Sequence, residues 1–317
     1  MDRETLATRL REFLPALDVI DDEEALRPFA GDALTAYRQQ PRVVVLPRGI
    51  EQVQRVMAFC AAEGVPVVAR GAGTGLSGGA LPNEAGVLLV LARMNRILEL
   101  DPVGRSARLE PGVRNLAISE AAAPHGLYYA PDPSSQIACS IGGNVAENSG
   151  GVHCLKYGLT VHNLLSVKLV TADGELLELG GRALDRPGLD LLALVTGSEG
   201  LLGGVVEVTV RLLPVAACVQ VLLAAFDSVA AAGDAVSAVI SRGILPAGME
   251  MMDRLAIQAA EDFVGAGYPR DAAAILLCEL DGEAEEVAAA VAQVTEILRE
   301  AGAGDIRVAT EAADRAR

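Results

Sequence analysis

The chain has 317 residues, of which 51% are apolar and 21% are charged, and its formal net charge is −16 at pH 7. This length and apolar content are sufficient for two globular domains with substantial cores. The acidic excess argues against nucleic acid as a partner, and no apolar stretch is long enough to span a bilayer, so any membrane contact is expected to be peripheral.

The five cysteines are scattered and include no C-x-x-C pair. This pattern predicts neither a disulfide framework nor a zinc or iron–sulfur site within the chain. The first residues, Met-Asp-Arg-Glu-Thr, lack the basic and apolar regions of a secretory signal. We therefore expect a cytoplasmic protein that is at most peripheral at the inner face of the membrane.

The first elements are predicted from hydrophobic periodicity. Leucines and a phenylalanine at helical spacing predict a helical leader over residues 1–40, in which we identify no chemistry. A strand, a helix and a second strand are then expected at 42–47, 51–63 and 65–69. This strand–helix–strand unit delivers the next loop at the carboxyl end of a strand, where ligands usually bind in α/β sheets.

A glycine-rich loop over residues 70–79 follows, with the sequence Arg-Gly-Ala-Gly-Thr-Gly-Leu-Ser-Gly-Gly. So many glycines leave backbone N–H groups free to close on an anion such as pyrophosphate, with Arg70 and Thr74 as further donors. The loop satisfies G-x-G-x-x-G, but a Rossmann site needs a helix directly afterwards, and residues 87–91 predict a strand. No Gly-Lys-Ser or Gly-Lys-Thr follows, which excludes a Walker A loop. Taken alone, the loop could also be an ordinary glycine-rich turn.

Three further clusters of glycine and small polar residues follow, at 139–144, 148–158 and 196–204. Glycine loses the most conformational entropy on folding, so four such clusters are costly unless a long, extended ligand compensates. The sequence therefore predicts a cofactor of dinucleotide size. The regular elements expected between the clusters are a hairpin at 97–110, a helix at 115–123, a hairpin at 166–179, a short helix at 190–194 and a strand at 205–212.

Beyond residue 214 the glycine clusters stop, and strands alternate with helices in a separate α/β layer. Helices are predicted at 228–242, 253–264 and 283–300, and strands at 219–225, 273–280 and 306–309, with one more strand between the first two helices. Periodicity does not decide whether this sheet is mixed or antiparallel. Residues 311–317 look like the start of a helix that has no stop signal.

No convincing catalytic set emerges from the residues themselves. The three histidines, His125, His153 and His162, lack the spacing of helical metal ligands, so we expect no metal site. We interpret each as structural, with His153 the best functional candidate because it lies inside a glycine cluster. Cys154 is expected on the opposite side of an extended chain, which gives no Cys-His pair. Glu199 could accept a hydrogen bond from a ribose hydroxyl or be a solvated turn residue.

Five segments carry a family resemblance through their order and spacing: 70–79, 131–135, 140–144, 148–151 and 196–200. Together they resemble the FAD-binding domain of the vanillyl-alcohol oxidase (PCMH-type) flavoproteins. Within that superfamily the chain is most similar to the FAD-dependent 2-hydroxy-acid dehydrogenases. The resemblance covers essentially the whole chain.

This resemblance implies an α+β fold, in which a PCMH-type FAD-binding domain of two α/β subdomains precedes an incomplete α/β cap domain. The implied divisions are a helical leader at 1–40, the FAD-binding domain at 41–214 and a partial substrate or cap domain at 215–317. The implied cofactor is FAD. Some relatives attach it through a histidine in the first loop, where this chain has Thr74, so we expect non-covalent binding.

The resemblance also implies which residues bind the cofactor. Residues 70–79 would hold the pyrophosphate, 131–135 and 140–144 would lie along the flavin and diphosphate, and 197–200 with 205–206 would line the ribose and adenine. The cofactor-binding residues predicted in this way are Arg70, Gly71, Ala72, Gly73, Thr74, Gly75, Leu76, Ser77, Gly78, Pro131, Asp132, Ser135, Ser140, Gly142, Gly143, Asn144, Asn148, Gly150, Gly151, Tyr157, Gly197, Glu199, Gly200, Val205 and Val206.

The implied activity is oxidation of a small 2-hydroxy acid, glycolate or D-lactate, to the 2-oxo acid. The electrons would pass to another acceptor or to partner subunits, including an iron–sulfur protein. The substrate-binding arginine, metal-binding histidine pair and Glu-His pair of such relatives have no match here. We therefore expect a C-terminally truncated chain that is inactive alone and whose catalytic residues are unknown. A non-catalytic FAD-binding or complex-assembly module is the alternative.

Overall fold

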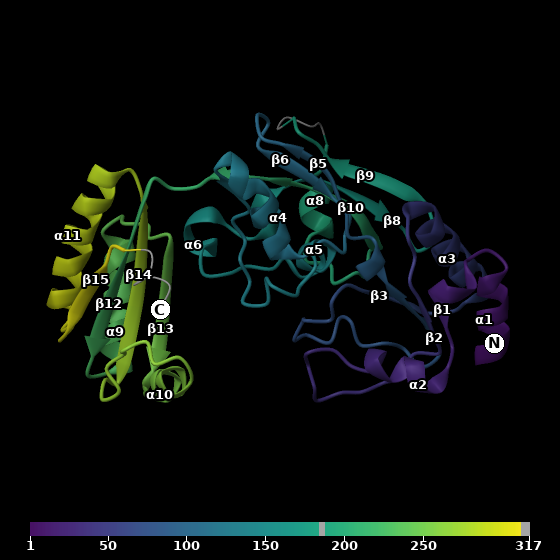
Figure 1. Ribbon diagram of the computed structural model, residues 1–317, viewed down its shortest axis with the longest axis horizontal. Helices are drawn as coiled ribbons and strands as arrows, with labels where there is room; N and C mark the ends of the chain where they lie inside the picture. Colours follow the sequence, from purple (N-terminus) through teal and green to yellow (C-terminus); the bar gives the residue numbers. More distant parts are fainter. Residues whose placement is uncertain (184–187, 312–317) are drawn as a thin grey trace. The chain divides into compact units, whose positions relative to one another are not determined.

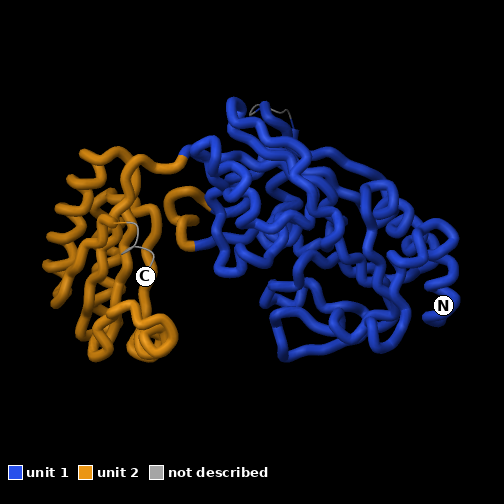
Figure 2. Tube along the Cα trace, viewed as in Figure 1, with its two compact units in different colours: residues 1–151, 159–214 blue, residues 152–158, 215–317 orange. Residues whose placement is uncertain are grey.

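The computed structural model describes residues 1–183 and 188–311. The chain forms two compact units: residues 1–151 with 159–214, and residues 152–158 with 215–317 (Figure 2). The segment 152–158 thus belongs to the second unit, although the sequence interpretation placed it in the FAD-binding domain. The domain boundaries themselves stay a prediction, and the helix expected at the C-terminus falls on residues 312–317, outside the described part.

The first unit begins with a four-stranded sheet of order β1-β2-β4-β3, in which β1 is antiparallel to β2 and the other pairs are parallel. Strands β1, β2 and β3 of this sheet are labelled in Figure 1. Its elements are α1 (Arg3–Arg11), η1 (Ala16–Asp18), β1 (Val19–Ile20), α2 (Glu23–Leu26), η2 (Arg27–Phe29), β2 (Val43–Val45), α3 (Ile50–Glu63), β3 (Val67–Arg70), β4 (Val87–Val90) and η3 (Leu91–Arg93). Leu6 and Leu10 of α1 share one core with Val53 and Val56 of α3. The first 40 residues are therefore not a purely helical leader, because they add a strand to this sheet and side chains to its core.

Two predicted connections in this sheet are confirmed. Gly64 ends α3 in the left-handed conformation, at φ 64°, and its N–H donates to the carbonyls of Cys60 and Ala61. The glycine-rich loop then runs from β3 directly to β4 without a helix, and these two strands are paired in parallel. The strand-to-strand connection excludes a Rossmann arrangement for this loop.

A second, antiparallel sheet of order β5-β6-β10-β8-β9 completes the first unit. Its strands are β5 (Ile97–Asp101), β6 (Ser106–Leu109), β8 (Leu164–Val170), β9 (Leu176–Gly180) and β10 (Gly204–Arg211). The helices of this region are α4 (Asn115–Ala122), η4 (Ala123–His125), α5 (Ile141–Glu147), α7 (Thr160–Asn163) and α8 (Leu191–Val195), and β7 (Leu127–Tyr128) pairs with β11 (Leu213–Pro214). Apolar residues of α4 and α5 share one core with β6, β8 and β10.

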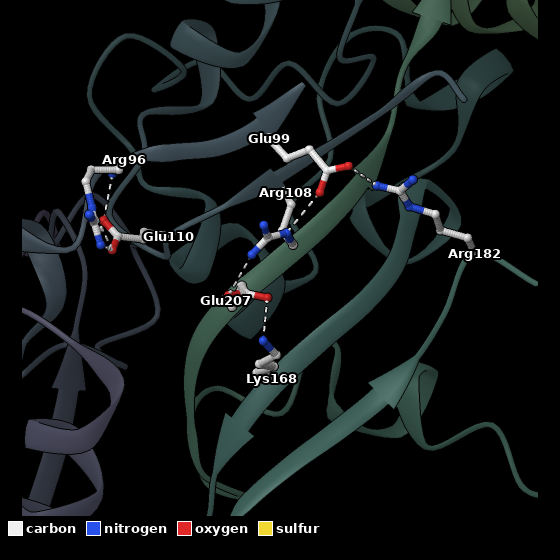
Figure 3. Close-up of polar contacts among 7 residues, drawn as sticks. All are labelled: Arg96, Glu99, Arg108, Glu110, Lys168, Arg182 and Glu207. Carbon is white, nitrogen blue, oxygen red and sulfur yellow. Dashed lines mark hydrogen bonds and ion pairs between the residues drawn. The ribbon is translucent and has the colours of Figure 1, made fainter. Parts of the chain in front are cut away.

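The second sheet also carries a network of ion pairs (Figure 3). Glu207 of β10 is almost fully buried and accepts from Lys168 of β8 at 2.9 Å and from Arg108 of β6 at 3.4 Å. Arg108 also pairs with Glu99, which pairs in turn with Arg182. The network neutralises a carboxylate on a strand that is buried along nearly its whole length.

The second unit contains a sheet of order β13-β14-β12-β15, in which all pairs are antiparallel. Periodicity had not decided between a mixed and an antiparallel sheet. Its elements are α6 (Cys154–Tyr157), β12 (Cys218–Phe226), α9 (Val229–Ser241), β13 (Gly248–Asp253), α10 (Arg254–Phe263), β14 (Ala274–Gly282), α11 (Ala284–Glu300) and β15 (Ile306–Ala309). Leu276 and Cys278 of β14 share a core with α9 and α11, whereas Ile275 packs with α10. The sheet therefore has helices on both faces. None of the described helices is long and apolar enough to cross a membrane.

Candidate cofactor site

The glycine-rich loop starts where β3 ends, and it folds against the beginning of α5. Gly71 has no space for a side chain, because a Cβ there would overlap Oγ of Ser140. Gly73 has φ 72°, a conformation that few other residues adopt. The glycines of this loop thus allow close backbone packing and a left-handed turn, in addition to any approach of a ligand.

A cavity of about 570 Å³ opens beside this loop, within the usual range of roughly 300–1,000 Å³ for small-molecule sites. Three stretches form most of its wall: the loop after β3, the region around α5 and the turn before β10. The predicted residues that line it are Arg70, Gly71, Ala72, Gly73, Thr74, Gly75, Leu76, Ser77, Ser135, Ser140, Gly142, Gly143, Asn144, Glu199, Gly200 and Val205. Segments predicted from separate motifs are therefore brought together around one cavity.

Arg70 is the single Lys or Arg side chain among the described residues that line the cavity. Its Nη1 donates to the carbonyl of Gly31 at 2.7 Å. Burial lowers the pKa of this guanidinium, an effect that the carboxylate of Asp32 partly offsets. The cavity thus has one cation, and that cation already has a partner within the protein.

The wall contributed by α5 contains an orphaned polar atom. Ser140 occupies the N-cap position of α5 but makes no capping bond, and its buried Oγ has no hydrogen-bond partner among the described residues. Asn144, one turn further on, accepts from Asn115 at 3.1 Å and donates to Ser149 at 3.2 Å. This amide network fixes Asn144 in the wall, whereas the buried hydroxyl of Ser140 is left unsatisfied.

The turn before β10 is attached to α5 through its backbone. The N–H groups of Gly197 and Glu199 donate to the carbonyls of Val145 and Ala146, each at 2.8 Å. Glu199 has φ 53°, and it lines the cavity together with Gly200. The turn before β10 and the end of α5 therefore form one continuous wall of the cavity.

Other predicted cofactor residues lie outside the cavity lining: Gly78, Pro131, Asp132, Asn148, Gly150, Gly151, Tyr157, Gly197 and Val206. Gly151 packs against the backbone of Asp132, where a Cβ would overlap the carbonyl group. Asn148 accepts from the N–H of Val161 at 3.0 Å. Tyr157 belongs to the second unit and donates its hydroxyl to Asp281.

Glu147 is a cavity residue that the sequence interpretation missed. Its Oε2 accepts from Oγ of Ser77 at 2.9 Å. It ends α5, one turn after Gly143, which also lines the cavity. Helical spacing would have placed the two residues on one face, but residues 140–144 were interpreted as a loop.

Two histidines have hydrogen-bonding partners within their own units. Nδ1 of His162 accepts from the N–H of Leu159 at 3.0 Å, and Nε2 of His153 lies 3.0 Å from Oε1 of Glu279. Cys154 begins α6, so the expectation that it follows His153 in an extended strand was wrong. Among residues 1–183 and 188–311, no three His, Cys, Asp or Glu side chains gather closely enough to hold a metal ion.

The cavity suits a long ligand with a diphosphate. Bare loop amides, the hydroxyls of Thr74 and Ser140 and one arginine surround it, whereas Glu147 and Glu199 add negative charge. With so little side-chain cation, recognition of phosphate must depend largely on backbone N–H groups. The orphaned Ser140 and the glycines at alternate positions of the loop both fit such a group.

Comparison with known proteins agrees with this geometry. The FAD binding domain model matches residues 41–180, and the model for the C-terminal domain of FAD linked oxidases matches residues 216–317. The chain is 62% identical over all 317 residues to the glycolate oxidase subunit GlcD of Escherichia coli K12, and it spans 64% of that protein. It is 35% identical over 315 residues to an uncharacterized FAD-linked oxidoreductase of Mycobacterium tuberculosis, covering 96% of this chain and 68% of the relative.

A solved structure shows the same fold. The structure of p-cresol methylhydroxylase with substrate bound superposes with a TM-score of 0.83 at 19% identity, over 96% of this chain and 65% of the other. The expected PCMH-type α+β fold and the FAD cofactor are thereby confirmed. The chain belongs to the FAD-linked oxidases, with an FAD-binding domain followed by the C-terminal domain of that family.

Proposed function

We propose that the complete protein oxidises a small 2-hydroxy acid, glycolate or D-lactate, to the corresponding 2-oxo acid. The observation that carries this proposal is the 62% identity to a glycolate oxidase subunit, which extends over every residue of the chain. The chain covers less than two thirds of that relative, so substrate and activity are assigned here to the complete protein. D-lactate differs from glycolate by one methyl group and is the natural second substrate to test.

In this proposal the cavity beside the glycine-rich loop holds FAD. The amides of 71–77 and the hydroxyls of Thr74 and Ser140 bind the diphosphate, and Glu199 accepts from a ribose hydroxyl near Val205. FAD, when bound, would supply the acceptor for the hydride removed from the substrate carbon, and this hydride carries both electrons of the oxidation. Non-covalent binding is part of the proposal, because Thr74 stands in the first loop where some relatives attach FAD through a histidine.

We further propose that the protein works with partner subunits. The E. coli relative is, by its name, one subunit of a glycolate oxidase. A flavin that accepts two electrons per substrate must pass them on before the next turnover, and an iron–sulfur protein is our proposed acceptor. A cytoplasmic location, with at most peripheral contact at the inner face of the membrane, completes the proposal.

The test uses the complete protein expressed from its own gene. Acid-released cofactor is identified by chromatography, and reduction of a dye is followed with glycolate, D-lactate and L-lactate in turn. We expect about one FAD per protein, released without proteolysis, and dye reduction with glycolate or D-lactate. FAD without turnover of any of the three acids would instead support a non-catalytic FAD-binding module. Absence of FAD would contradict the proposed site.

A further inference from the structure

Residues 30–39, which we call the strap, contact the cofactor loop without lining the cavity. The N–H of Gln39 donates to the carbonyl of Ala30 at 2.8 Å and closes the strap on itself. Its central residues are exposed, including Tyr37 and Arg38. None of residues 30–39 is among those that line the cavity. The sequence interpretation assigned no chemistry to this segment.

Two hydrogen bonds connect the strap to the beginning of the cofactor loop. Nη1 of Arg70 donates to the carbonyl of Gly31 at 2.7 Å, and the N–H of Ala33 donates to the carbonyl of Gly73 at 2.9 Å. The two bonds run in opposite directions, one from the loop to the strap and one from the strap to the loop. Together they fix both ends of the first turn of the loop.

Packing adds to these bonds. The guanidinium of Arg70 lies against Gly73, where a Cβ would overlap Nη2 and Cζ of the arginine. A methyl group of Leu34 lies 3.6 Å from the position of a Cβ on Gly78. The strap therefore contacts the loop near its beginning and near its end, and the intervening residues 74–77 line the cavity together with residues 70–73.

We infer that Arg70 is a positioning residue, which braces the cofactor loop against the strap, so that FAD binding and the order of the strap are linked. The inference rests on the proposed FAD site. The planar fork of Arg70 gives one N–H group to Gly31 and places the rest of the guanidinium against Gly73. A ligand that binds the ordered loop must then also stabilise the strap, by linkage.

The first test measures cleavage by trypsin after Arg38 in the complete protein, with and without saturating FAD, by mass spectrometry. Linkage predicts that FAD slows this cleavage by about tenfold, the factor that corresponds to 1.4 kcal/mol. Cleavage after Arg270, an exposed arginine of the second unit, serves as the internal control and should not change. Equal protection at both arginines would mean general stabilisation and would overturn the inference, as would no protection at Arg38.

Variants separate bracing from direct phosphate binding. Arg70→Lys keeps the charge but loses the planar fork, so we expect FAD to bind about tenfold more weakly and to protect Arg38 no longer. Ala33→Pro removes the second hydrogen bond without changing any charge, and we expect the same two effects. Arg299→Lys, the same exchange at an exposed position of α11, should behave as wild type.

The outcomes distinguish this inference from the proposed function. If wild type contains no FAD, both the proposed FAD site and the inferred positioning role of Arg70 are wrong. If wild type binds FAD and Arg70→Lys weakens binding but keeps protection at Arg38, then Arg70 is a direct phosphate ligand and the brace is wrong. Normal FAD affinity and normal protection in Ala33→Pro would also contradict it.

Discussion

Gly142→Ala tests how closely α5 is packed where it forms the cavity wall. A Cβ on Gly142 would lie 2.7 Å from Cβ of Pro111, 3.1 Å from its carbonyl oxygen and 3.2 Å from its Cα. Pro111 cannot move aside as a flexible side chain would, so α5 must shift. Overpacking of this kind costs about 1–3 kcal/mol. This cost lowers the free energy of unfolding. Because Ser140, Gly142 and Gly143 all line the cavity, we also expect the Kd for FAD to rise, by at most the roughly 140-fold that corresponds to 3 kcal/mol.

The measurement is an FAD titration of the complete apoprotein, followed by flavin fluorescence, together with urea unfolding. Gly233→Ala is the matched control, since Gly233 also lies in a helix and has no other atom within 4 Å of its added Cβ. That control should raise the free energy of unfolding by about 0.5–1 kcal/mol and leave FAD affinity unchanged. Wild-type affinity and stability in Gly142→Ala would refute the reasoning.

Three further predictions concern stability and reactivity. Asp18→Asn removes a buried carboxylate that two arginines hold, and should lower the free energy of unfolding at pH 7 by about 2 kcal/mol in urea, because charge-assisted hydrogen bonds are lost. Those arginines lower the pKa of Asp18, so its contribution to the free energy of unfolding is complete above about pH 4 and is lost as the pH falls further. A stability difference between wild type and Asp18→Asn that stays constant down to pH 2 would contradict this. Burial raises the pKa of Cys60 to about 12, so iodoacetamide at pH 8 should label half-buried Cys154 and spare Cys60 until urea is added, as read by mass spectrometry. Glu207→Gln removes the partner of Lys168 and should lower the free energy of unfolding, measured by thermal unfolding, by about 2 kcal/mol. An unchanged Tm would show that the ion-pair network does not contribute to stability.

The second unit was predicted well because its elements are long and regular. A helix was expected at 283–300 and α11 spans Ala284–Glu300. Val287, Val294 and Leu298 recur at helical spacing and all enter one core. Where a single apolar face decides the structure, periodicity is enough. The antiparallel order of the strands depends on chain connections, which periodicity does not contain.

Helix α5 was missed because its sequence disfavours a helix locally. Gly142 and Gly143 each lower helix propensity by about 1 kcal/mol relative to alanine. Tertiary contacts override this preference: Asn144 is held by Asn115, and Gly142 permits the approach of Pro111. The same error hid Glu147, whose place in the cavity follows only once the helix is known.

Glycine clusters predicted the site only in part. The residues at 70–77 and 140–144 do meet at the cavity, as the motifs indicated. Gly151, in contrast, is small because the backbone of Asp132 passes close to it. Close approach of another segment of the chain and close approach of a ligand demand the same residue type, so the sequence alone cannot separate them.

The most direct test of the account is an experimentally determined structure of the complete protein with FAD bound. The account predicts the diphosphate against the loop amides of residues 71–77, with the hydroxyl of Ser140 bonded to the cofactor and Arg70 still bonded to Gly31. A diphosphate bound elsewhere on the chain, or a Ser140 hydroxyl that remains without a partner in the complex, would contradict it.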